Sequence, residues 1–100
     1  MVISPEEAKN IMETEDNIVI LDVRTEEEYN EKHIPNTILI SLDKLSNIVE
    51  EKIKDKNKKI LVYCRSGKRS KIATQILLKK GYKNVLDFGG IMNWRYEVEN

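Results

Sequence analysis

The stretch ILVYCRSGKRS, residues 60–70, decides the fold class of this chain. Residues 60–63 form a short apolar run without polar alternation, which is typical of a strand buried on both faces of a sheet. Cys64 ends the run, and the polar, glycine-containing residues that follow break the strand pattern. Apolar residues then return with helical spacing at positions 72, 73, 76 and 77. The stretch predicts a buried strand, a tight loop and a helix in direct succession.

The same succession is expected on both sides of this stretch. Residues 18–21 (IVIL) form a second buried-type run, and residues 37–40 and 85–88 are further strand candidates. Capping boxes, in which a Ser or Thr is followed three residues later by Glu, mark two helix starts, at Ser4 and Thr25. The expected helices run from Pro5 to about Thr14, from Thr25 toward Lys32, after Ser41, up to Gly81, and after Gly90 as a terminal helix carrying Trp94.

Alternating strands and helices predict an α/β fold. We expect one domain, residues 1–100, with a central, mostly parallel sheet of about four to five strands and helices on both faces. A chain of this size can bury roughly two-thirds of its unfolded surface, which is enough for a single core. Ligands of such sheets bind at the carboxyl ends of the strands. Residues 22–24 and residues 64–70 both follow strands at that edge.

The composition excludes several classes of function. The 17 Lys and Arg residues balance the 17 Asp and Glu residues, so no net field favours binding to nucleic acid or to an anionic membrane. A single cysteine and a single histidine supply neither an internal disulfide nor a four-ligand zinc site. We therefore expect no metal and no other cofactor. The chain opens without an apolar signal segment and has no membrane-spanning run, so a cytoplasmic location is expected.

Positive charge concentrates beside the single cysteine. Between residues 64 and 71 there are four cations and no acid: Arg65, Lys68, Arg69 and Lys71. A helix that begins near Gly67 would direct unpaired N–H groups into the turn that Cys64 opens, which favours the thiolate form of this cysteine. Gly67 itself indicates a backbone that needs a positive φ or a close approach to a bound atom. From these residues alone, the alternative remains a cysteine packed as a small core residue beside a solvated basic helix end.

The segment CRSGKRS (64–70) resembles the active-site signature of single-domain rhodaneses, which are sulfurtransferases. The segments LDVR (21–24), EEYNEKHIP (27–35) and GGIMNW (89–94) follow that family's order and spacing, so the resemblance covers nearly the whole chain. Lys32 and Asn36 depart from the pattern, because the family usually has glycine at both positions. Asparagine tolerates left-handed backbone, whereas a left-handed lysine would cost about 1–2 kcal/mol.

The resemblance implies a function and a site. Cys64 would be the nucleophile that carries a persulfide, and Arg69 would hold the persulfide charge together with the backbone N–H groups of the arch, residues 64–69. The other implied site residues are the substrate-binding Arg65, Ser66, Gly67, Lys68 and Ser70 and the loop-supporting Asp22 and Arg24. Sulfur would pass from a small donor such as thiosulfate to cyanide or a thiol, with a protein acceptor as a further partner. His33 and Trp94 are expected to be structural.

Two other functions are consistent with a cysteine followed by a basic loop. Tyrosine phosphatases, dual-specificity phosphatases and arsenate reductases use such a loop, but the phosphatase spacing is Cys-x5-Arg and this chain has Cys-x4-Arg. A loop shorter by one residue, up to roughly 3.5 Å of contour, closes around a smaller volume. The second alternative is a non-catalytic rhodanese-like binding or sulfur-relay module. Such modules often lack the cysteine, so its presence here favours the enzyme.

Overall fold

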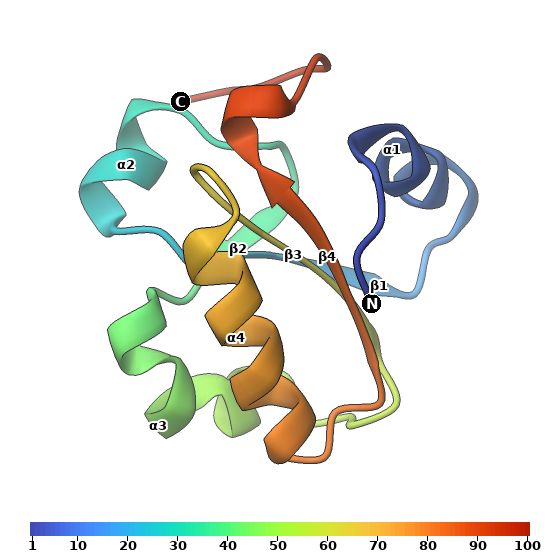
Figure 1. Ribbon diagram of the computed structural model, residues 1–100, viewed down its shortest axis with the longest axis vertical. Coiled ribbons are helices and arrows are strands. Elements are labelled where there is room, and N and C mark those ends of the chain that lie inside the picture. The colour runs from blue at the N-terminus through green and yellow to red at the C-terminus, as the bar shows by residue number, and fades with distance from the viewer.

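Four strands form one parallel sheet in the computed structural model, which describes residues 1–100 (Figure 1). The strands lie in the order β2-β1-β3-β4, and their bounds are β1 Ile18–Asp22, β2 Thr37–Leu39, β3 Lys59–Cys64 and β4 Asn84–Gly90. The helices are α1 Pro5–Thr14, α2 Glu26–Glu31, α3 Leu42–Lys52 and α4 Lys68–Lys79, followed by the 3-10 turn η1, Ile91–Asn93. The expected α/β fold is confirmed, with four strands.

Helices cover both faces of the sheet, as expected. Alternate residues of β3 point to opposite faces, so this strand contributes side chains to the core on each side. Ile60, Val62 and Cys64 belong to a cluster of 13 buried residues that includes side chains of α3 and α4. Leu61 and Tyr63 belong to a second cluster, of seven buried residues, which includes Ala8 of α1. Residues 60–63 are 0% exposed, so the short apolar run is buried on both faces.

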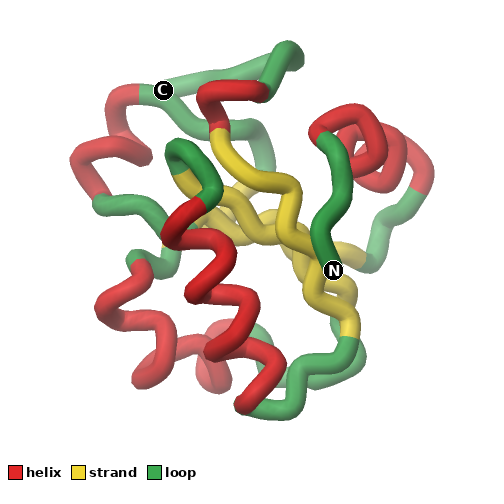
Figure 2. The backbone as a smooth tube through the Cα atoms, viewed as in Figure 1, coloured by secondary structure: helices red, strands yellow, loops and turns green.

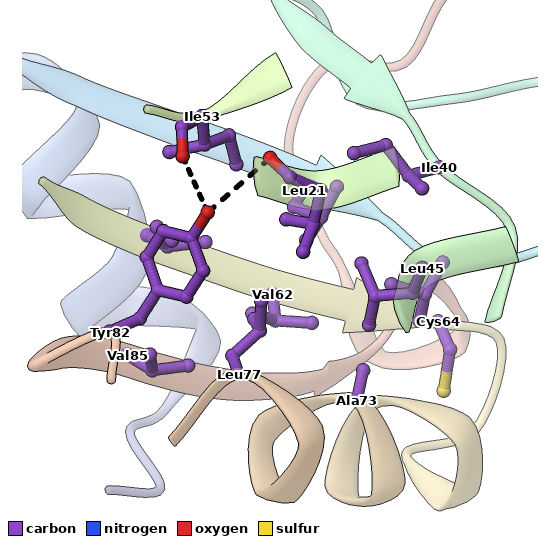
Figure 3. Packing of buried hydrophobic residues seen from close by; sticks show 13 residues of the cluster. Leu21, Ile40, Leu45, Ile53, Val62, Cys64, Ala73, Leu77, Tyr82 and Val85 are labelled. Carbon is purple, nitrogen blue, oxygen red and sulfur yellow. Dashed lines mark hydrogen bonds between the residues drawn. The ribbon is translucent and has the colours of Figure 1, made fainter. Parts of the chain in front are cut away.

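The larger cluster ends at the cysteine. Leu45 of α3 and Ala73 and Leu77 of α4 pack over β3, and Tyr82 donates a hydrogen bond from its hydroxyl group to the carbonyl of Ile53 (Figure 3). Figure 3 shows Cys64 at one end of this cluster, with its sulfur turned away from the other labelled side chains. The hydrophobic packing therefore fixes the Cys64 backbone while leaving the sulfur at the carboxyl end of the sheet.

Both predicted capping boxes are present. Ser4 accepts a hydrogen bond from the Glu7 N–H at 3.0 Å, and the Glu7 side chain accepts one from the Ser4 N–H at 3.0 Å. Thr25 and Glu28 make the same reciprocal pair at the start of α2. Local sequence signals thus determine where these two helices begin.

The expected terminal helix carrying Trp94 is wrong. Residues 91–93 form only one 3-10 turn, and Trp94 follows it with its ring centroid 5.5 Å from that of Phe88. The tail then turns back toward α2, where Glu99 and His33 exchange two backbone hydrogen bonds of 2.8 Å. These long-range bonds satisfy backbone groups that a continued helix would have paired locally. The packing role expected for Trp94 is confirmed.

The two positions at which the family usually has glycine are both unstrained. Asn36 has φ of 64°, the left-handed conformation that asparagine tolerates. Lys32 has φ of −166°, which is extended backbone open to any residue. His33 is buried, and its Nδ1 lies 2.9 Å from the carbonyl oxygen of Tyr29, in keeping with its expected structural role.

None of the helices has the length and apolar character that a membrane span requires.

Candidate active site

A tight loop joins the end of β3 at Cys64 to the start of α4 at Lys68 (Figure 2), and Cys64 is buried there. The N–H of Gly67 donates a hydrogen bond to the Cys64 Sγ at 3.0 Å. Gly67 is the N-cap of α4 and has φ of 109°, so the positive φ that the sequence indicated is present. A side chain at this position would strain the backbone that directs the N–H group at the sulfur. The sulfur therefore lies at the first turn of α4, where the helix dipole favours negative charge.

Strand β4 supports this loop from the side. Gly90 lies opposite Cys64 in the β3–β4 register. A Cβ atom at Gly90 would come within 2.0 Å of the Arg65 carbonyl oxygen and 2.7 Å of the Ser66 Cα atom. The N–H of Met92 donates to that same Arg65 carbonyl at 3.2 Å. Gly90 is thus a second glycine on which the loop depends, and its only sequence signal is its place in GGIMNW.

The predicted substrate-binding residues divide into two groups. Arg65, Ser66 and Lys68 are exposed on the outside of the loop. Ser70 is 0% exposed, and its hydroxyl group donates to the Gly67 carbonyl at 3.1 Å. Ser70 therefore closes the first turn of α4 from within, whereas the three exposed residues are free to meet a substrate.

Asp22 and Arg24 form a buried ion pair at the end of β1. The Arg24 Nε lies 3.0 Å from both carboxylate oxygens of Asp22, and a terminal nitrogen lies 2.7 Å from Oδ2. A further bond of 2.7 Å reaches the Lys32 carbonyl. Burial lowers the pKa of Arg24, but the hydrogen bonds and the charge of Asp22 outweigh it, so the pKa is raised. The pair ties β1 to the segment after α2, which is consistent with the loop-supporting role expected for it.

Arg69 is engaged by a residue that the sequence analysis missed. Its two terminal nitrogens donate to the two carboxylate oxygens of Glu28 at 2.7 Å and 2.9 Å. Hydrogen bonding by Arg69 lowers the pKa of Glu28 from 4.5 to about 2, and the same bonds raise the pKa of Arg69. Glu28 also completes the Thr25 capping box, so one carboxylate fixes both the start of α2 and the end of the loop. The pairing spans 41 residues, and it forms because α2 and α4 begin at the same edge of the sheet.

The pairing of Arg69 leaves two exposed cations of the loop without a salt bridge, Arg65 and Lys68. An anion that approaches this loop meets exposed positive charge and the N–H group of Gly67. A cysteine sulfur that accepts this N–H bond at the start of a helix is placed for attack on an anionic sulfur donor.

Replacing Glu28 by glutamine is expected to remove an acid-sensitive part of the stability. Folding lowers the Glu28 pKa from 4.5 to about 2, so its contribution is complete above pH 4.5 and is lost as pH falls through about 2. The two side chains are 27% and 32% exposed, so we expect only about 0.2–1 kcal/mol at neutral pH. Urea unfolding of the wild-type and Glu28→Gln proteins, at neutral pH and at about pH 3, measures the difference in their free energies of unfolding. A difference that stays constant with pH would contradict the assignment.

Comparisons with known proteins identify the family to which the fold and the sequence are similar. The model of the Rhodanese-like domain family matches residues 4–97. The chain is 40% identical over 80 residues to the thiosulfate sulfurtransferase GlpE of Coxiella burnetii, covering 79% of this chain and 73% of that protein. It is 35% identical over 71 residues to the thiosulfate sulfurtransferase PspE of Escherichia coli, covering 71% and 68%. A solved E. coli rhodanese with anions superimposes with a TM-score of 0.77 at 30% identity, covering 82% of this chain and 96% of that one.

Proposed function

The chain belongs to the rhodanese-like domain family, and we propose that it is a sulfurtransferase that carries sulfur on Cys64 between a small anionic donor and a nucleophilic acceptor. One observation supports this most directly: the only cysteine has its sulfur 3.0 Å from the backbone nitrogen of Gly67, in a loop that also carries the exposed Arg65 and Lys68. The relatives named as thiosulfate sulfurtransferases favour thiosulfate as the donor.

In the first half-reaction, the Cys64 thiolate attacks the outer sulfur of thiosulfate. The new S–S bond forms as the bond between the two thiosulfate sulfurs breaks, and sulfite leaves with the electron pair. Arg65 and Lys68 are exposed and unpaired, so they attract the dianionic donor to the loop. The N–H group of Gly67, already directed at the sulfur, then stabilises the persulfide that replaces the thiolate.

In the second half-reaction, cyanide or a thiolate attacks the outer sulfur of the persulfide. The S–S bond breaks, the acceptor keeps the sulfur, and Cys64 returns as a thiolate. Arg69 is the last residue of the loop, and its ion pair with Glu28 holds the loop against α2. Its guanidinium group also adds positive charge to the loop. Sulfur transfer in two separate steps predicts ping-pong kinetics.

The proposed sulfur transfer is tested by measuring the mass of the intact protein. Incubation with thiosulfate, removal of excess donor and intact-mass spectrometry should show one adduct of about 32 Da, which cyanide removes. Cyanide should release one equivalent of thiocyanate for each loaded chain. A protein that stays unmodified at millimolar thiosulfate would refute the proposal.

The wild-type protein is expected to hydrolyse p-nitrophenyl phosphate at a rate close to the uncatalysed rate. The loop has four residues between Cys64 and Arg69, so we expect its N–H groups to enclose a volume nearer one sulfur atom than a tetrahedral phosphate. Phosphate oxygens would lose water without gaining donors, which is unfavourable. The colorimetric assay with Cys64→Ser as the blank measures this. Robust turnover that depends on Cys64 would favour the phosphatase alternative.

A longer loop tests the same argument from the other side. One glycine inserted between Ser66 and Gly67 should weaken sulfur transfer.

A further inference from the structure

The outward surface of α4 has no part in the reaction described above, apart from Lys68. Six exposed residues share this surface, which we call the α4 outer face: Lys68, Lys71, Ile72, Gln75, Leu78 and Lys79. Ile72 and Leu78 are 49% and 48% exposed, although both are large aliphatic residues. Figure 1 shows α4 running across the front of the molecule, from the loop beside α2 to the opposite end of the sheet. Both side chains share one face of the helix with lysines, so this face offers apolar surface and positive charge together to a partner.

Charge on this face is one-sided although the chain as a whole is neutral. Helix α4 contains four cations and no acid, and only Arg69 among them has a salt bridge. Helix α2, on the other side of the loop, contains four glutamates and no cation. The positive field is therefore local to α4, and it would attract a negatively charged partner to that side of the loop.

The α4 outer face is continuous with the sulfur. The Gly67 that binds the Cys64 Sγ is the N-cap of α4, and Lys68 is its first residue. A helix of 12 residues is about 18 Å long, so a partner seated along it has one end at the loop. Met92 adds an apolar residue on the other side of the loop, since its side chain is 65% exposed and its N–H bonds to the Arg65 carbonyl. A small anionic donor requires no surface of this length.

We propose that the α4 outer face docks an acidic protein whose cysteine thiol accepts the sulfur from Cys64. The proposal rests on the proposed function, because it places a protein acceptor of the same persulfide on one face of the molecule. The partner's thiolate attacks the outer sulfur, the S–S bond at Cys64 breaks, and Cys64 leaves as a thiolate. The partner then carries the persulfide, and no external oxidant or reductant is required.

Two synthetic peptides serve as probes. They share one cysteine, the same length and the same amphipathic helical pattern of leucines, and they differ only in carrying Glu or Lys at the polar positions. Wild-type protein is loaded with thiosulfate, and sulfur transfer to each peptide is followed by mass spectrometry. We expect the acidic peptide to react about tenfold faster than the basic one at low ionic strength, and added salt should reduce this preference.

The variants separate docking from chemistry. Lys71→Glu combined with Lys79→Glu should slow transfer to the acidic peptide about tenfold, and Ile72→Gln should slow it further, while transfer from thiosulfate to cyanide stays at the wild-type rate. Lys54→Glu combined with Lys83→Glu is the matched control. It makes the same charge change with two exposed lysines that lie outside the α4 outer face, in the connections that precede β3 and β4. The control should leave transfer to the acidic peptide within about twofold of wild type.

Three results would overturn the docking proposal. These are equal rates for the two peptides, an equal loss in the α4 and control variants, or binding of anionic lipid vesicles that depends on Lys71 and Lys79 without a peptide preference. A protein that does not load sulfur would instead refute the proposed function. Docking is then judged by titrating unloaded protein with a cysteine-free acidic peptide, where shifts of NMR signals confined to α4 support it and their absence contradicts it.

Discussion

Replacing Cys64 by serine is expected to lower the rate of thiosulfate:cyanide transfer at least about 1,000-fold, because a serine hydroxyl is not ionised at neutral pH and cannot carry a sulfane sulfur. The chain has no second cysteine to substitute for it. Serine is nearly the same size, so the buried site should stay packed and the thermal midpoint should change little. Steady-state kinetics, thiocyanate release and intact mass after thiosulfate measure the loss. Full activity in a folded Cys64→Ser protein would remove Cys64 from the mechanism.

Replacing Gly90 by alanine is expected to damage both stability and activity. The new Cβ atom would lie 2.0 Å from the Arg65 carbonyl oxygen and 2.4 Å from its carbon, and both are backbone atoms that cannot rotate away. Either β4 or the loop must move, which should destabilise the fold by about 3 kcal/mol. A displacement of about 1 Å at the loop should lower kcat/KM about 100-fold, because the N–H group would no longer be directed at the transferred sulfur.

Gly81→Ala is the matched control for this variant. Gly81 also requires a positive φ, of 95°, but a Cβ atom there would meet nothing within 4 Å. It should lose about 1–2 kcal/mol from backbone strain and keep its activity. Urea unfolding and steady-state kinetics on all three proteins give the comparison. If Gly90→Ala behaves like Gly81→Ala, β4 does not support the loop as the structure indicates.

The elements of the fold were predictable because their signals are local. The Ser4 and Thr25 capping boxes mark helix starts through bonds that span three residues, and both are formed. The apolar run at residues 60–63 predicted a strand buried on both faces, since such a strand has no polar side to expose. The spacing of apolar residues along a helix does not show how many of them the rest of the protein covers. Ile72 follows the apolar spacing of α4, yet it is 49% exposed.

The missed parts of the candidate site depend on contacts between distant segments. Glu28 and Arg69 are separated by 41 residues, and each has a convincing local explanation, as a helix cap and as a loop cation. Their pairing follows only once α2 and α4 start at the same edge of the sheet. The tail after Trp94 is similar, because its conformation depends on the backbone of His33. Local patterns therefore pointed to Cys64 as the candidate nucleophile, while the groups that position its loop required the assembled sheet.

The interior position of β3 determines how the protein loses activity when it unfolds. Strand β3 is hydrogen-bonded to β1 on one side and to β4 on the other, and it lies between both buried clusters. Amide protons in such a strand exchange with solvent only when the whole domain opens, whereas the short edge strand β2 can fray on its own. The sulfur-bearing residue is thus attached to the segment that deuterium should reach last. Heat or urea should consequently abolish sulfur transfer in the same cooperative step as folding, so that residual activity reports the fraction of molecules still folded.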